Sequence, residues 1–104
     1  MQSRIAAIYL DLGDDKKAYK AAQKAAKKGS VKNESSNYAT MGSALINLHC
    51  YKDAISAFKK SVKAAKTKKT KRFPRQWIKF ADAEGTRLQR LRDVGATVPG
   101  CNKA

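Results

Sequence analysis

Two similar segments recur in the sequence, and this internal repetition limits the fold more than any other feature. "DKKAYKAAQKAAKK" (15–28) and "YKDAISAFKKSVKA" (51–64) carry small or apolar residues at the same spacings of four and three. Aligning Ala18 with Ala54 places the copies 36 residues apart. Repeats of about 20 to 50 residues are typical of solenoids, in which neighbouring helix pairs share one core. The spacing therefore predicts an all-α chain of stacked helix pairs.

A partner helix is predicted before each copy. Its apolar residues in the second copy follow one another at intervals of three, four and three, which places them on one stripe: Tyr38, Met41, Leu45 and Leu48. Gly42 lies beside this stripe. Glycine inside a helix is about 1 kcal/mol less favourable than alanine, so we expect a second helix to pack closely at this position. Ala6 is the equivalent small residue of the first copy.

Helix-ending and helix-starting residues divide the chain. Gly29 follows two lysines, as at a helix end, and Ser35 or Ser36 is predicted to cap the next helix. Pro74 is predicted to begin a terminal helix, because proline fits a first turn better than a helix interior. The expected organisation is a domain over 1–93, with repeats over about 1–31 and 35–66 and a capping helix over about 74–93, followed by a tail over 94–104.

Composition restricts the function. Lys and Arg number 23 against 8 Asp and Glu, a formal charge of +15 that favours an acidic partner or an anionic surface. No run approaches the roughly 20 apolar residues of a membrane span, and the N-terminus lacks the features of a secretory signal. With one histidine and scattered acids, we expect no enzymatic activity.

The two cysteines are too few and too far apart to imply a metal site or a disulfide framework. We expect Cys50 to be a turn residue, His49 a partly exposed helix end and Cys101 a thiol of the tail. The sequence predicts no metal and no cofactor.

The second copy resembles the tetratricopeptide repeat (TPR) family in a set of residues at the family's spacing: Tyr38, Met41, Gly42, Leu45, Tyr51, Ala54 and Phe58. This resemblance implies an α-solenoid of two TPR hairpins and a capping helix. The segment 38–66 followed by "QWIKF" is also similar to the last repeats of bacterial envelope TPR proteins that accompany TonB-type transport systems. That similarity implies the C-terminal part of a longer periplasmic protein; otherwise a cytoplasmic location is expected.

In the TPR family the first helix of each pair lines a concave groove. The resemblance therefore implies a protein-interaction scaffold that binds a peptide segment of a partner, and the positive net charge favours an acidic segment. The expected groove residues are Arg4, Ala7, Asp11, Ser36, Thr40, Ser43, Asn47, Arg75, Lys79 and Asp82, of which Arg4, Arg75 and Lys79 are expected to supply the positive charge.

Two alternatives remain open. Lysine-rich outer faces of 15–28 and 51–64 could bind nucleic acid or another anionic surface without sequence preference, or the groove could serve only to stack on further repeats. We also expect self-association through Ile8 and Leu12, which have no covering helix in the predicted arrangement.

Overall fold

The computed structural model describes residues 2–29 and 33–102, with residues 2–4 described as backbone only. These residues form five α-helices: α1 (Gln2–Asp11), α2 (Asp15–Lys28), α3 (Glu34–Asn47), α4 (Tyr51–Ala64) and α5 (Lys68–Asp93). No strand occurs in the described part of the chain. The predicted all-α class is confirmed.

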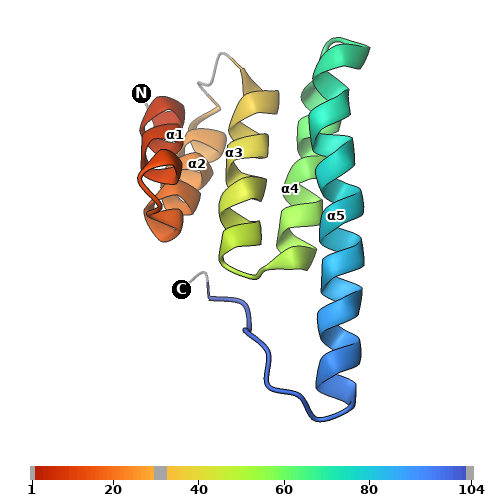
Figure 1. Ribbon diagram of the computed structural model, residues 1–104. Helices are drawn as coiled ribbons and strands as arrows, with labels where there is room; N and C mark the ends of the chain where they lie inside the picture. The colour runs from red at the N-terminus through yellow and green to blue at the C-terminus, as the bar shows by residue number, and fades with distance from the viewer. Residues whose placement is uncertain (1, 30–32, 103–104) are drawn as a thin grey trace.

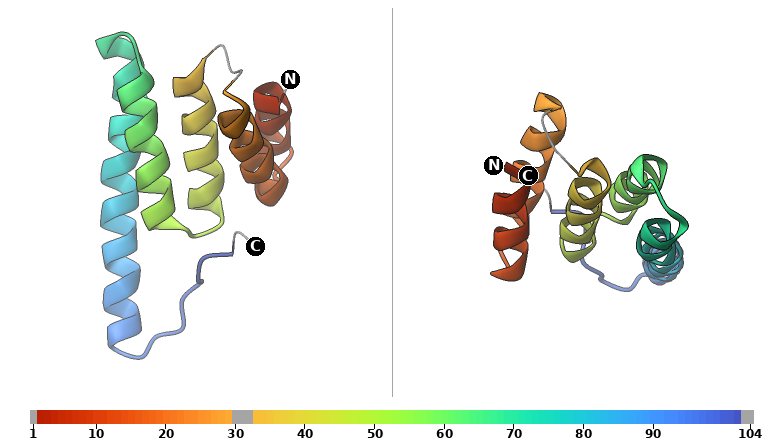
Figure 2. Two further views of the ribbon diagram at one scale, coloured as in Figure 1. Left: turned by 180° about the vertical axis from the view of Figure 1, so that it is seen from behind. Right: turned by 90° about the horizontal axis from the view of Figure 1, so that it is seen from above.

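Each helix packs against the next one along the chain, as Figure 1 shows. In addition α1 contacts α3, and α3 contacts α5. The first helices of successive pairs therefore adjoin one another, while α2 and α4 lie behind them (Figure 2). The resulting body is elongated, with extents of 45 × 29 × 21 Å.

Local capping explains where the helices begin, and it corrects two predictions. Asn33, not Ser35 or Ser36, caps α3, because its side chain accepts a hydrogen bond from the Ser36 backbone N–H at 3.0 Å. Helix α5 begins at Lys68 rather than Pro74. Thr67 and Thr70 form a reciprocal capping box that starts the helix six residues earlier than predicted.

Pro74 consequently lies inside α5, where it cannot donate a backbone hydrogen bond. It is one of the most completely buried side chains in the described chain. Burial of the ring against the neighbouring helices offsets the lost hydrogen bond, and the helix continues through it.

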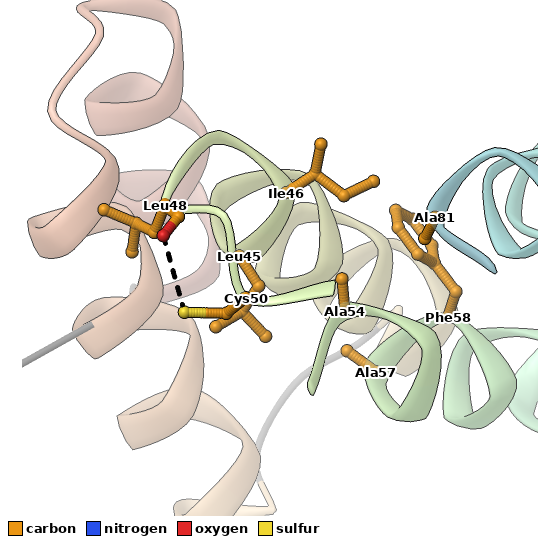
Figure 3. Packing of buried hydrophobic residues seen from close by; sticks show 8 residues of the cluster. All are labelled: Leu45, Ile46, Leu48, Cys50, Ala54, Ala57, Phe58 and Ala81. Carbon is orange, nitrogen blue, oxygen red and sulfur yellow. Dashed lines mark hydrogen bonds between the residues drawn. The ribbon is translucent and has the colours of Figure 1, made fainter. Parts of the chain in front are cut away.

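Small residues allow the helices to pack closely at equivalent positions of each pair. Ala6, Ala18, Ala54 and Ala81 are fully buried, and Gly42 is buried as well. The main cluster joins α3, α4 and α5 around Phe58, whose ring extends toward Ala81 (Figure 3). Met41 packs against this cluster and also against the smaller one formed by Ala6, Ala21 and Ala22. One residue of α3 thus connects the cores of the two helix pairs.

Polar groups also join the helices in the interior. The buried Asn37 side chain donates from Nδ2 to the Ala22 carbonyl at 3.0 Å, which links α3 to α2. Ser35 and Ser61 exchange hydrogen bonds with each other's backbone carbonyls at 2.8 and 2.7 Å. These bonds between Ser35 and Ser61 link α3 to α4. Such specific contacts favour one relative position of these helices.

The expectation that Cys101 is a thiol of the tail is wrong. After α5 the tail turns back beneath the helices (Figure 1), and Cys101 is bonded to Cys50 with a Cα–Cα distance of 4.5 Å. The Asn102 backbone N–H donates to the Leu48 carbonyl at 3.0 Å, and Arg92 Nη2 donates to the Pro99 carbonyl at 2.9 Å. Cys50 is buried immediately before α4, and His49 takes a left-handed conformation (φ 63°) in the turn.

Apolar side chains in α1 and in the turn that follows it remain uncovered. Ile8 is 57% exposed and Leu12 is 74% exposed. This exposure agrees with the expectation that no helix covers this face. Self-association through it stays a prediction.

Candidate functional site

A groove of about 840 Å³ lies between the facing sides of α1, α3 and the start of α5. Hydroxyl groups and short side chains make up most of its lining. Its residues are Leu10, Asn33, Glu34, Ser35, Ser36, Ala39, Thr40, Ser43, Ser61, Ala64, Ala65, Lys66, Thr67, Lys69, Thr70, Phe73 and Pro74. Phe73 is 49% exposed and supplies the largest apolar surface.

Some hydroxyls of the groove are already used within the protein. Thr40 Oγ1 donates to the Ser36 carbonyl at 3.0 Å, and Thr67 and Thr70 bond to each other in the capping box. The side-chain hydroxyls of Ser36 and Ser43, by contrast, form no hydrogen bond within 2–29 and 33–102. These two residues stand seven apart on α3, or about 10 Å along the helix axis. They are therefore available to a ligand that lies along α3.

The charged groups of the groove differ from those expected. Lys66 and Lys69 stand at the end near α5, and Glu34 begins α3. Both lysines are exposed. Sequence reasoning missed Lys69 because it placed the start of the helix at Pro74. With α5 beginning at Lys68, Lys69 falls one turn before Phe73 and on the same side of the helix.

The predicted groove residues are divided by the structure. Thr40 and Ser43 line the groove. Asn47 is not among the lining residues; its Nδ2 donates to Asp15 Oδ1 at 2.9 Å and so joins the end of α3 to the start of α2. The side chain of Arg4 lies outside the described part of the structure.

Arg75 and Lys79 also lie away from the groove. They line a shallow depression along the outer side of α5 together with Lys68, Lys71, Arg72 and Gln76. Helical geometry explains this position, since Arg75 follows Phe73 by two residues and hence by about 200° around the axis. Two of the three side chains that were expected to supply the positive charge of the groove thus face the opposite way.

A second hollow of about 840 Å³ surrounds the disulfide, between the start of α4 and the second half of α5. Tyr51 lies at its edge, with its hydroxyl 3.4 Å from His49 Nδ1. Burial, followed by the negative charge of Glu84, raises the pKa of Tyr51 above 10.0, while Arg87 acts in the opposite direction. Glu84 and Arg87 form an ion pair one turn apart.

One group of potential metal ligands occurs at this hollow. Cys50, Cys101 and Asp53 bring one ligand atom each within 4.8 Å of one another. The two sulfurs are joined in the disulfide, however. They therefore offer no thiolates, which are the form in which cysteine binds a metal. In the oxidised protein this group does not make a metal site.

Comparisons with protein-family models, with curated proteins and with solved structures give no match for this chain. None of the helices described here has the length and apolar character of a membrane span.

Proposed function

We propose that the protein is a scaffold that binds an extended, acidic peptide segment of a partner protein in the groove along α3. The observation that carries the proposal is the pair of unbonded hydroxyls at Ser36 and Ser43. Their separation of about 10 Å equals three residues of an extended chain, so both can bond to one peptide backbone. Phe73 then packs against an apolar side chain of the peptide, and Lys66 or Lys69 binds a carboxylate.

The proposed family is that of tetratricopeptide-type repeats. The support is the burial of small residues at matching positions: Ala6, Gly42 and Ala81 in the first helices, and Ala18 and Ala54 in the second. The contacts of α1 with α3 and of α3 with α5 are those expected when first helices line one side of a solenoid. The groove lies on this side.

An oxidising compartment, such as the bacterial periplasm, is the proposed location. The Cys50–Cys101 disulfide supports it, because disulfides persist in secreted and periplasmic proteins and are rare in the cytosol.

The test selects acidic peptides from a random display library with the intact, oxidised protein and then measures their affinity for matched variants. Ser43→Glu introduces a negative charge into the groove. Ser56→Glu makes the same change at an exposed site of α4 outside it. We expect Ser43→Glu to weaken binding at least tenfold and Ser56→Glu to leave it unchanged. Peptides that bind Ser43→Glu as tightly as the parent would show that the groove is not their site.

Lys69→Gln supplies an independent check of the charge. It should lower the affinity for peptides that carry a carboxylate and leave the affinity for their amide analogues unchanged. Equal loss for both kinds of peptide would contradict the role of Lys69.

A further inference from the structure

The segment that covers most of α4 and the first half of α5 contains ten cations and no acid. Between Asp53 and Asp82 the sequence has no Asp or Glu over 28 residues. Nine of the ten cations in this stretch are exposed: Lys59, Lys60, Lys63, Lys66, Lys68, Lys69, Arg72, Arg75 and Lys79. Because α4 and α5 pack together, these cations give this end of the molecule a strongly positive field, although they stand on more than one face.

Four of these cations form a straight row on α5. Lys68, Arg72, Arg75 and Lys79 follow at spacings of four, three and four, so they stand on one side of the helix over about 16 Å. They line the shallow depression on the outer side of α5. A row of this length matches a polyanionic chain better than it matches a single small anion.

Exposed aromatic rings border this row. Phe73 is 49% exposed and Phe80 is 45% exposed, and they stand two turns apart on the same side of α5. Trp77 lies between them, with its ring centroid 5.9 Å from Phe73 and 5.3 Å from Phe80. The three rings therefore form a continuous aromatic edge.

Gln76 joins the two features. It is exposed, and it is three or four residues from Arg72 and Lys79 on one side and from Phe73 and Phe80 on the other. Residues at these separations are neighbours on a helix surface. We call these five residues, together with Lys68 and Arg75 of the row, the α5 patch. It offers positive charge, an amide and aromatic faces side by side.

We infer that the α5 patch binds single-stranded nucleic acid without sequence preference. The phosphates of the nucleic acid lie along the row of cations, and its bases stack on the exposed faces of Phe73 and Phe80. Single strands are bound in this way by basic surfaces with adjacent aromatic rings. Arg and Lys bind the phosphates, and the amide of Gln76 can donate to or accept from any base.

The exposure of the rings favours this partner over a membrane. Insertion into the lipid interface requires apolar side chains that reach about 5 to 10 Å into the bilayer. About half of each phenylalanine is covered by its neighbours, so each ring offers a partly exposed surface to a base and neither side chain is free to extend as a whole into a bilayer. The row of cations faces away from the peptide groove. Phe73 borders both surfaces, so a peptide in the groove and a base on the α5 patch compete for that ring.

The single Trp77 provides the readout. Titration of the intact, oxidised protein with an oligothymidylate of about 12 nucleotides, a length within known site sizes, should quench Trp77 fluorescence. Affinity should fall with salt with a logarithmic slope of about −3, as expected for four neutralised phosphates of a single strand. An abasic oligomer of equal length should bind at least tenfold more weakly and cause little quenching.

Matched variants locate the site. Arg72→Gln, Arg75→Gln and Lys79→Gln combined should reduce the salt slope by about 2 units, whereas Lys20→Gln, Lys24→Gln and Lys27→Gln on the exposed side of α2 should leave it unchanged. Gln76→Glu changes one exposed residue at the centre of the patch and should weaken binding at least tenfold. Ser43→Glu in the groove should have no comparable effect. A circular dichroism spectrum of each variant verifies its fold.

Several results would overturn the inference. The abasic oligomer could bind as tightly as oligothymidylate, which would exclude stacking. The α2 variant could lose as much affinity as the α5 variant, which would indicate attraction to the whole charge of the protein. Anionic phosphatidylglycerol vesicles could bind more tightly than oligothymidylate, and Gln76→Glu could weaken that binding. Together these two results would identify a lipid surface as the partner.

Discussion

The ring of Phe58 occupies the space that a side chain at position 42 would need. A Cβ atom on Gly42 would lie 2.7 to 2.8 Å from three atoms of this ring. Helices α3 and α4 thus approach each other at a point where only glycine fits without a shift. Phe58 itself is fully buried, so any movement of its ring must displace neighbouring core residues.

Substitution of Gly42 should therefore destabilise the protein although it improves helix propensity. We expect Gly42→Ala to lower the free energy of unfolding by about 1 to 3 kcal/mol, as for other overpacked cores, and Gly42→Leu to lower it further. Urea denaturation followed by circular dichroism measures the change. The double variant Gly42→Ala with Phe58→Leu should lose less unfolding free energy than the two single variants lose in sum. Simple additivity would mean that the two side chains do not clash.

Reduction of the Cys50–Cys101 bond should destabilise the fold. The bond closes a loop with a sequence separation of 51, for which chain entropy predicts a loss of about 4 kcal/mol when it is broken. Denaturation with and without a dithiol reductant should show this difference in the parent protein. Cys101→Ser should match the reduced parent and should not respond to reductant. A parent whose stability is unchanged by reduction would contradict the prediction.

The raised pKa of Tyr51 predicts a loss of stability at alkaline pH. The folded protein holds the phenol proton more tightly than the unfolded chain does, because burial and then Glu84 disfavour the phenolate. Tyr51 therefore contributes stability that is fully present below about pH 10 and is lost as the pH rises through the folded-state pKa. Above about pH 10 the unfolding free energy of the parent should therefore fall relative to that of Tyr51→Phe. A rise relative to Tyr51→Phe would show that the sign is wrong.

Local patterns were sufficient to predict the helices and their close packing. The spacing around Gly42 identified a contact that the Phe58 ring explains, and Ala6, Ala18 and Ala54 all occupy the buried positions that the repeat indicated. These features depend on residues within one or two helical turns, where geometry is fixed by the helix itself.

Long-range and end-of-helix features were predicted less well. The rule that proline ends helices placed the start of α5 at Pro74. The capping box at Thr67 and the burial of Pro74 override that rule. The earlier start does not change which side of the helix the residues after Pro74 occupy. It adds Lys69 to the helix and so places it beside Phe73 in the groove. Arg75 and Lys79 were assigned to the groove by analogy with the other helices, although they stand on the outer side of α5.

The disulfide depends on three lengths considered together: those of α4, α5 and the tail. Helix α5, with 26 residues, extends about 18 Å beyond α4, which has 14. The eight residues that begin at Val94 and end at Cys101 can span about 26 Å, so they can return to the start of α4. These lengths permit the tail to return to Cys50 but do not require it, which is why the spacing of the cysteines alone did not indicate a bond.

The bond between Cys50 and Cys101 also determines how the protein responds to mechanical load. A pulling force applied at the C-terminal end passes through the disulfide directly into the turn between α3 and α4. Helices α4 and α5 lie within the closed loop and are therefore shielded from that tension while the bond is intact. When the bond is reduced, the same force acts along α5 from its last turn, and that helix becomes the first element to be peeled away.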